Sequence, residues 1–191
     1  MSALERRPLV AGLLAGDDDV LVVTGLGAPS WDAAAAGDRD LTFPLWGAMG
    51  GAVAMGLGLA QAQPQRRVLV LTGDGELLMG IGSLSTVGWR QPANLAVVVL
   101  DNERYGETGG QRTHTAGRTD LAAVAAACGF PTTFTVRDPT GTAGLGERLW
   151  SSPGPRFCVA KVRPDDEPLV MPPRDGVVLR ERFRRALGLS R

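Results

Sequence analysis

Residues 68–75, Val-Leu-Val-Leu-Thr-Gly-Asp-Gly, are the part of the chain that most directly determines its fold. An apolar run of this length is typical of a strand that is buried on both faces of a parallel sheet. The two glycines let the backbone turn and approach a ligand closely. Residues 76–89 then have the pattern of a helix, and Glu76 in its first turn suits the helix dipole. This stretch therefore predicts one strand, loop and helix of an α/β fold.

The same order of strand, loop and helix continues on both sides of this stretch. Further strands are predicted where apolar runs occur, at 20–24, 94–100, 132–136 and 156–162. Helices are predicted where the composition and spacing of apolar residues favour them, at 4–15, 46–62, 120–128 and 140–150. Residues 25–30 are expected to form a glycine-rich loop, and residues 31–43 a loop or a short helix. This alternation predicts an α/β fold with a doubly wound, mostly parallel sheet and helices on both faces.

We expect a single domain over residues 1–191, because no linker, repeat or low-complexity tract interrupts the sequence. Residues 164–191 are expected to form a proline-rich tail that ends in a basic helix. The first residues lack the apolar segment of a secretory signal, which favours a cytoplasmic protein. The longest apolar stretch, 45–60, is too short and too rich in glycine to predict a membrane span.

Charge and composition exclude several classes of function. Lys and Arg total 20, as do Asp and Glu, so the chain lacks the basic surplus that a nucleic-acid-binding protein would usually carry. Lys161 is the only lysine, and no Gly-Lys pair exists, which excludes a Walker-type phosphate loop. Cys128 and Cys158 both lie in apolar runs, and we interpret them as small buried hydrophobic residues.

Acidic and amide side chains end two neighbouring strands of the predicted sheet. Asp74 follows the first strand, and Asp101 and Asn102 follow the next. Because carboxyl ends of parallel strands meet at one edge of a sheet, these side chains should lie close together. Backbone N–H groups at a helix start favour an anion such as phosphate, but an aspartate there would repel it unless a cation lay between them. The pattern thus predicts an oxygen-liganded Mg²⁺ that bridges protein and phosphate.

Residues 73–102 resemble the cofactor motif of the thiamine diphosphate (ThDP) enzyme family, which begins with Gly-Asp-Gly and ends with two asparagines. The first of these asparagines is replaced by Asp101, whose role the resemblance leaves open. The resemblance implies that Mg²⁺ is held by the side chains of Asp74 and Asn102 and by the backbone carbonyl of Arg104. It covers residues 20–165 and implies the pyrophosphate-binding (PP) type of ThDP-binding fold.

The same resemblance implies where ThDP lies. Met49 would prop the cofactor in its bent shape, and the carbonyl of Gly47 would accept a hydrogen bond from its amino group. Met49 can also be interpreted as an ordinary core methionine of a packed helix. Thr24 and Gly25 look like an additional contact to the diphosphate. The motif implies further cofactor-binding residues, which are Gly73, Asp74, Gly75, Glu76, Asn102, Tyr105, Gly106 and Glu107.

ThDP enzymes also need a pyrimidine-binding (PYR) domain, whose glutamate activates the cofactor, and no residue of this chain matches that glutamate. We therefore expect a separate PYR (α) subunit and a hetero-oligomer such as α2β2 or larger. Residues 101–111 look most like the β subunits of sulfopyruvate decarboxylase and the C-terminal half of phosphonopyruvate decarboxylase. The implied function is the PP subunit of a ThDP- and Mg²⁺-dependent 2-oxo acid decarboxylase, a lyase. A carboligase subunit resembling acetolactate synthase and a non-catalytic ThDP-binding or scaffold subunit are the alternatives.

The single histidine, His114, lies in the polar loop after this motif. It is either a solvated loop residue or a catalytic acid–base group near the cofactor. Arg104, Arg112 and Arg118 lie nearby in the loop and would suit a sulfonate or phosphonate group, although loop arginines are also commonly just solvated. The sequence leaves open the side chain of the substrate, the choice between decarboxylation and carboligation, and the stoichiometry of the complex.

Overall fold

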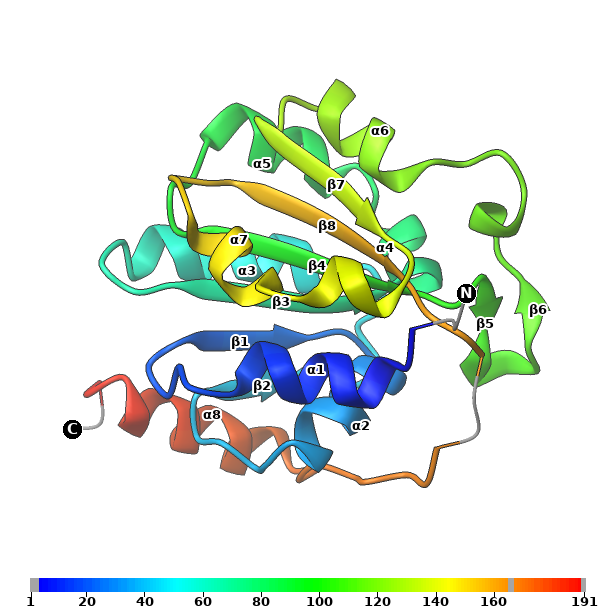
Figure 1. Ribbon diagram of the computed structural model, residues 1–191. Helices are drawn as coiled ribbons and strands as arrows, with labels where there is room; N and C mark the ends of the chain where they lie inside the picture. The colour runs from blue at the N-terminus through cyan, green and yellow to red at the C-terminus, as the bar shows by residue number, and fades with distance from the viewer. Residues whose placement is uncertain (1–3, 165–166, 190–191) are drawn as a thin grey trace.

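The computed structural model describes residues 4–164 and 167–189 and contains a central sheet of six parallel strands (Figure 1). The strands are β1 (Leu21–Thr24), β2 (Thr42–Pro44), β3 (Val68–Gly73), β4 (Leu95–Asp101), β7 (Thr132–Val136) and β8 (Arg156–Lys161). Their order across the sheet is β2-β1-β3-β4-β8-β7. The predicted parallel α/β sheet is confirmed. Residues 1–3, 165–166 and 190–191 of the predicted domain and tail lie outside the described residues.

Helices cover both faces of the sheet (Figure 1). They are α1 (Arg6–Leu14), α2 (Ala28–Ala35), α3 (Ala52–Ala62), α4 (Asp74–Met79), α5 (Ser83–Arg90), α6 (Leu121–Ala127), α7 (Leu145–Trp150) and α8 (Gly176–Ala186). Strand residues alternate between two buried clusters, as the period of two in a strand requires. In β3, Val68 and Val70 face the cluster with α3, α5 and α6, whereas Leu69 and Leu71 face the cluster with α1 and α7. The core therefore consists of two apolar layers with the sheet between them.

The predicted helix at 46–62 begins only at Ala52, so the prediction for its first residues is wrong. Gly47 and Gly50 have φ values of 70° and 86°, which form a turn in place of the first helical residues. A Cβ at Gly50 would lie 2.7 Å from the backbone nitrogen of Gly80. Met49 therefore sits on a turn, not within a packed helix, and the turn lies directly against the chain near Gly80.

The predicted helix at 76–89 is also interrupted, because the structure has two helices, α4 and α5, in its place. A Cβ at Gly80 would lie 1.9 Å from the carbonyl oxygen of Gly50, so the two backbones are in contact at this break. The predicted helix at 140–150 is divided in the same way into a 3-10 turn, η3 (Pro139–Thr142), and α7. Both interruptions follow from glycine-containing turns that shorten the helices.

Residues 28–44 contain an α-helix and a strand. The sequence instead predicts a loop at 25–30 and a loop or a short helix at 31–43. Helix α2 begins at Ala28, within the predicted glycine-rich loop, and has Pro29 in its first turn. Strand β2 has three residues and lies at the edge of the sheet beside β1. Its proline at position 44 is typical of edge strands. The sheet is therefore one strand wider than the apolar runs indicate.

The C-terminal segment returns to this edge of the sheet. Helix α8 packs beside β2, where Phe183 makes an edge-to-face contact with Phe43 at 5.6 Å between ring centroids (Figure 1). The indole nitrogen of Trp46 donates a hydrogen bond of 3.0 Å to the carbonyl of Pro173. Covering an edge strand in this way protects its unpaired backbone groups. Within residues 4–164 and 167–189, the structure has no helix with the length and apolar character that a membrane span requires.

Candidate functional site

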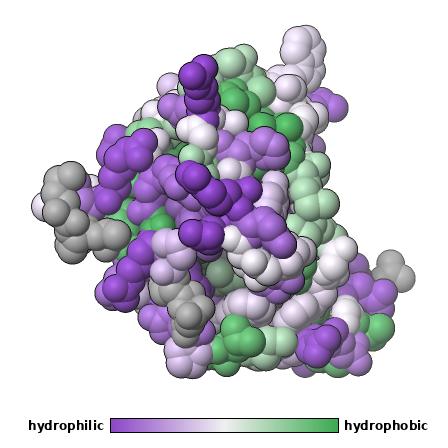
Figure 2. Space-filling view, turned by 90° about the vertical axis from the view of Figure 1, so that its right-hand side faces the viewer, coloured by the Kyte–Doolittle hydropathy of each residue, from purple (hydrophilic) through white to green (hydrophobic). Residues whose placement is uncertain are grey.

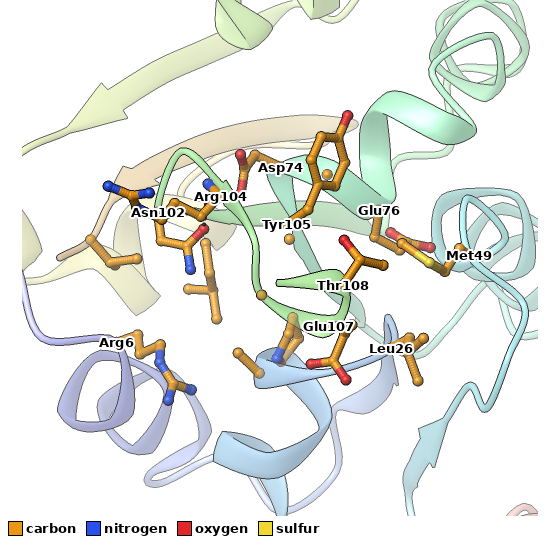
Figure 3. A pocket seen from close by; sticks show the side chains of 17 residues that line it. Arg6, Leu26, Met49, Asp74, Glu76, Asn102, Arg104, Tyr105, Glu107 and Thr108 are labelled. Carbon is orange, nitrogen blue, oxygen red and sulfur yellow. Dashed lines mark hydrogen bonds between the residues drawn. The ribbon is translucent and has the colours of Figure 1, made fainter. Parts of the chain in front are cut away.

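A cavity of about 70 Å³ lies at the carboxyl ends of the central strands (Figure 3). It is lined by parts of the three loops that follow β1, β3 and β4, together with the turn that carries Met49. Its lining residues include Leu26, Pro29, Met49, Gly73, Asp74, Gly75, Glu76, Asn102, Arg104, Tyr105, Gly106 and Glu107. The structure thus brings the predicted loops together around one site.

Asp74 is a buried carboxylate on this site, with 1% of its surface exposed. The hydroxyl groups of Thr113 and Thr115 lie 2.5 and 3.1 Å from its Oδ2 atom. Burial raises the pKa of Asp74, and the nearby negative charge of Asp101 acts in the same direction. In the part of the chain that the structure describes, no cation forms an ion pair with Asp74. A buried carboxylate without an ion-pair partner is unfavourable, and a bound cation would compensate its charge.

Asp101 forms an ion pair with the only lysine of the chain. The Nζ atom of Lys161 lies 2.9 Å from Asp101 Oδ2 and 2.7 Å from a carboxylate oxygen of Glu103. The other oxygen of Asp101 lies 2.7 Å from the Thr115 hydroxyl and accepts the N–H of Glu103 at 3.1 Å. The carboxylate that replaces an asparagine in the motif is therefore neutralised by Lys161, and Thr115 connects it to Asp74.

Asn102 lines the cavity from the loop after β4. Its Oδ1 atom accepts the backbone N–H of Arg104 at 3.0 Å, which leaves one lone pair of this amide oxygen for another partner. Arg104 begins a short hairpin of β5 (Arg104–Tyr105) and β6 (Gln111–Arg112). Among the described residues, no three His, Cys, Asp or Glu side chains form a metal-binding group. A metal at Asp74 would take its other ligands from amide, carbonyl and cofactor oxygens, as Mg²⁺ does.

The loop after β4 folds back over the glycines of the site. A Cβ at Gly75 would lie 2.6 Å from the ring of Tyr105. A Cβ at Gly27, where φ is 84°, would lie 2.6 Å from a carboxylate oxygen of Glu107. Burial raises the pKa of Glu107. Both glycines are therefore required so that the loop can lie closely on the strand ends.

The sequence matches a family model over most of this region. Residues 31–160 match the model described as thiamine pyrophosphate enzyme, C-terminal TPP binding domain. This chain belongs to the thiamine pyrophosphate enzyme family. Thiamine pyrophosphate is another name for ThDP, so this match confirms the resemblance that the motif at 73–102 indicates.

Individual relatives agree with this family. Sulfopyruvate decarboxylase subunit beta of Methanothermobacter thermautotrophicus is 37% identical over 183 residues, which cover 96% of this chain and 92% of that protein. The protein of the same description from Methanocaldococcus jannaschii is 43% identical over 60% of this chain and 61% of its own length. Phosphonopyruvate decarboxylase of Streptomyces viridochromogenes is 48% identical over 68% of this chain but 31% of its own length. The matched region therefore spans less than two thirds of the latter two proteins.

A solved structure shows the same fold. It carries the description "putative thiamin diphosphate-dependent enzyme isolated from Mycobacterium smegmatis" and superimposes with a TM-score of 0.70. The superposition covers 83% of this chain and 31% of that chain, at 21% sequence identity. At this identity the likeness concerns the fold alone.

Three residues that the resemblance implies as ThDP contacts have other partners in the structure. Thr24 is fully buried, and its hydroxyl lies 2.6 Å from that of Ser30. Gly25 lies against Glu76, since a Cβ there would be 3.0 Å from the carboxyl carbon of Glu76. The carboxylate of Glu76 accepts hydrogen bonds from Gly50, Ala52 and Thr72. The structure therefore does not bring the hydroxyl of Thr24 to the cavity, and it occupies both oxygens of Glu76 with protein donors.

His114 lies in the 3-10 turn η2 (His114–Ala116), where it is exposed and does not line the cavity. Arg104 lines the cavity, whereas Arg112 and Arg118 do not, and Arg112 donates a hydrogen bond to the carbonyl of Ala116. A catalytic role of His114 stays a prediction. Its neighbours Thr113 and Thr115 hydrogen-bond to Asp74, whereas His114 itself is exposed.

Sequence reasoning missed several residues of the site, among them the polar residues Arg6, Thr113, Thr115 and Lys161. Arg6 lines the cavity from α1 and forms an ion pair of 2.6 Å with the buried Asp32. The two threonines and Lys161 form the polar surroundings of Asp74 and Asp101. Their positions depend on segments far apart in the sequence, so no local pattern indicates them.

Proposed function

We propose that this chain is the PP subunit of a heteromeric ThDP- and Mg²⁺-dependent 2-oxo acid decarboxylase, with sulfopyruvate or phosphonopyruvate as the type of substrate. The observation that carries this proposal is the buried Asp74 carboxylate, which has no cation partner among the described residues and lies beside Asn102 at the strand ends. The relatives described as sulfopyruvate and phosphonopyruvate decarboxylases support the choice of reaction. We propose residues 1–191 as one PP domain.

Different residues of this site would hold the metal and the rings of the cofactor. The side chains of Asp74 and Asn102 and the carbonyl of Arg104 would hold Mg²⁺, and Mg²⁺ would offset the repulsion between Asp74 and the diphosphate. Met49 would support the rings, because it lines the cavity from a turn. ThDP, when bound, supplies a thiazolium ring that accepts electrons as carbon dioxide leaves.

A PYR subunit would complete the site. The cavity of about 70 Å³ is smaller than a typical small-molecule pocket of roughly 300 Å³ or more. The oxygens of Glu76 are occupied by Gly50, Ala52 and Thr72, so this carboxylate is not available to activate the cofactor. The relative described as subunit beta aligns over 92% of its length, which supports a separate chain for the PYR part. We propose a hetero-oligomer such as α2β2.

The loop at 103–118 would recognise the anionic end of the substrate. Figure 2 shows polar side chains over the middle of the face that carries the strand ends. A sulfonate or phosphonate requires charged hydrogen-bond donors, which Arg104, Arg112 and Arg118 offer in this loop. His114 is the candidate acid–base group of the same loop, provided that the complex brings it to the substrate.

The experiment that tests this proposal is reconstitution with a PYR-type subunit, followed by analysis of the products from sulfopyruvate and phosphonopyruvate. We expect carbon dioxide and the free aldehyde, and we expect no activity from either subunit alone. A coupled acyloin product would instead identify a carboligase, which one relative, an acetolactate synthase large subunit of Escherichia coli at 29% identity, makes a specific alternative. A complex that binds no ThDP would identify a scaffold and contradict the proposal.

A further inference from the structure

Glu76 connects three segments of the candidate site although only one of them is its neighbour in sequence. It is buried, with 4% of its surface exposed. Its Oε1 atom accepts the backbone N–H of Gly50 at 2.8 Å and that of Ala52 at 3.3 Å. Its Oε2 atom accepts the hydroxyl of Thr72, at the end of β3. The carboxylate thus joins the end of β3 and the start of α4 to the turn that carries Met49.

The backbone N–H groups at the start of α3 need a hydrogen-bond acceptor from outside the helix. The first N–H groups of any helix have no acceptor within it, and they are commonly satisfied by the side chain of the N-cap residue. The N-cap of α3 is Gly51, which has no side chain and forms no such hydrogen bond. Ala52 is the first residue of α3, and Glu76 provides the missing acceptor. A negative charge at this helix end is favourable with respect to the helix dipole.

The geometry leaves little freedom for the turn. Gly47 and Gly50 have positive φ values of 70° and 86°, which favour glycine. The backbone of Gly50 also contacts that of Gly80, at the other end of α4 from Glu76. Helix α4 therefore contacts the turn at both of its ends, through the Glu76 carboxylate and through Gly80. Figure 3 shows Glu76 and Met49 on the same side of the pocket.

We propose that Glu76 is a positioning residue that sets the place of Met49 relative to Asp74. By capping α3 from the first turn of α4, it fixes the turn that would support the cofactor rings against the segment that would hold the metal. This role differs from the direct cofactor contact that the motif implies for Glu76. The inference rests on the proposed function for the role of Met49, whereas the link between Glu76 and the turn does not depend on it.

The first test measures amide hydrogen exchange at Gly50 and Ala52 in the full chain without cofactor. We expect Glu76→Ala to accelerate exchange at both amides about tenfold or more, because their acceptor is lost. Glu76→Gln, which retains one acceptor oxygen, should restore most of the protection. Glu107→Ala is the matched control, since Glu107 also lines the cavity but forms no hydrogen bond with the turn among the described residues. Unchanged exchange at both amides in Glu76→Ala would overturn the proposal.

The second test compares two ligands in the complex with a PYR-type subunit. We expect Glu76→Ala to weaken binding of ThDP about tenfold and to change Mg²⁺-dependent binding of inorganic diphosphate less than twofold. In a Met49→Ala background, Glu76→Ala should weaken ThDP binding little further, because the two changes act through the same contact. Equal weakening of both ligands would show that Glu76 acts on the diphosphate or metal, and would overturn the positioning role.

A third variant keeps both tests decisive if Glu76→Ala does not fold. Glu76→Asp retains the charge but is one methylene shorter, and it should accelerate exchange at Gly50 and Ala52 while core amides such as that of Val97 stay protected. Full protection of the turn in Glu76→Asp would contradict the proposal. If the complex binds no ThDP at all, the proposed function fails, and the exchange measurement still decides whether Glu76 holds the turn.

Discussion

Replacing Lys161 with methionine tests how the buried Asp101 is stabilised. Asp101 has 2% of its surface exposed, and Lys161 is its ion-pair partner at 2.9 Å. The described residues contain no other cation within ion-pairing distance of Asp101. Methionine retains much of the length of the lysine side chain but removes its charge. The variant should therefore leave a buried carboxylate without compensation.

The structure sets the expected size of this effect. Removing one partner of a buried ion pair typically costs about 3–5 kcal/mol in the free energy of unfolding. Asp101 retains the Thr115 hydroxyl and the Glu103 N–H as hydrogen-bond donors, so we expect the lower end, about 3 kcal/mol. For a domain of this size that loss corresponds to a decrease of about 6–12 °C in Tm.

The companion variant Asp101→Asn should cost only about 1 kcal/mol. Lys161 keeps Glu103 at 2.7 Å and is 19% exposed, so its charge remains paired and partly solvated. The loss in the free energy of unfolding of the double variant should then be about 2 kcal/mol smaller than the sum of the two single losses, because neither charge of the pair is left alone. Denaturant and thermal unfolding of all four proteins at pH 7 provide the measurement.

The dependence on pH gives a further check on the same pair. Burial alone would lower the pKa of Lys161, but the carboxylates of Glu103 and Asp101 outweigh it and raise the pKa above its ordinary value of 10.5. The stabilising effect of the pair is therefore fully present below pH 10.5 and is lost as the pH rises through the pKa of the folded state. A Tm for Lys161→Met within about 2 °C of the original chain at pH 7, where the expected decrease is larger, would refute this reasoning.

The remaining predictions concern the metal ligand and the glycines. Asp74→Asn should weaken Mg²⁺-dependent ThDP binding by the complex at least about 100-fold in calorimetric titration, while its Tm stays equal or rises, since burial already raises the pKa of this carboxyl; a lower Tm would contradict this. Gly80→Ala should destabilise the chain by about 3 kcal/mol, because its Cβ would lie 1.9 Å from the Gly50 carbonyl. Gly58→Ala, with open space around its Cβ, should instead stabilise helix α3 by about 0.5–1 kcal/mol; thermal unfolding distinguishes the two, and equal effects would contradict the contact at position 80. Gly75→Ala should weaken ThDP binding about tenfold in the same titration, because the new Cβ would lie 2.6 Å from the aromatic ring that packs there; unchanged binding would contradict this packing.

The strands that the sequence predicts well are those buried on both faces. β3 and β4 appear as continuous apolar runs because helices cover both sides of the sheet. β2 has three residues and ends in Pro44, so it lacks such a run and was missed. The start of α3 and the break after α4 depend on the contact between Gly50 and Gly80, which no local pattern indicates.

The candidate site divides in the same way. Asp74 and Asn102 follow adjacent strands, so the spacing along the chain is enough to place them together. The partners of the neighbouring carboxylates come from packing, as in the contact of Asp101 with Lys161 and that of Glu76 with Gly50. The sequence therefore predicts which residues meet at the strand ends, and the structure is needed to show which carboxylates already have partners within the protein.

The most direct test of the central claim is an equilibrium titration of ThDP in the presence of Mg²⁺. It compares this chain alone, a PYR-type subunit alone and their complex. If this chain holds one half of the cofactor site, binding should be tight and saturable only in the complex. Binding to this chain alone with the affinity of the complex would contradict the claim that the site is shared.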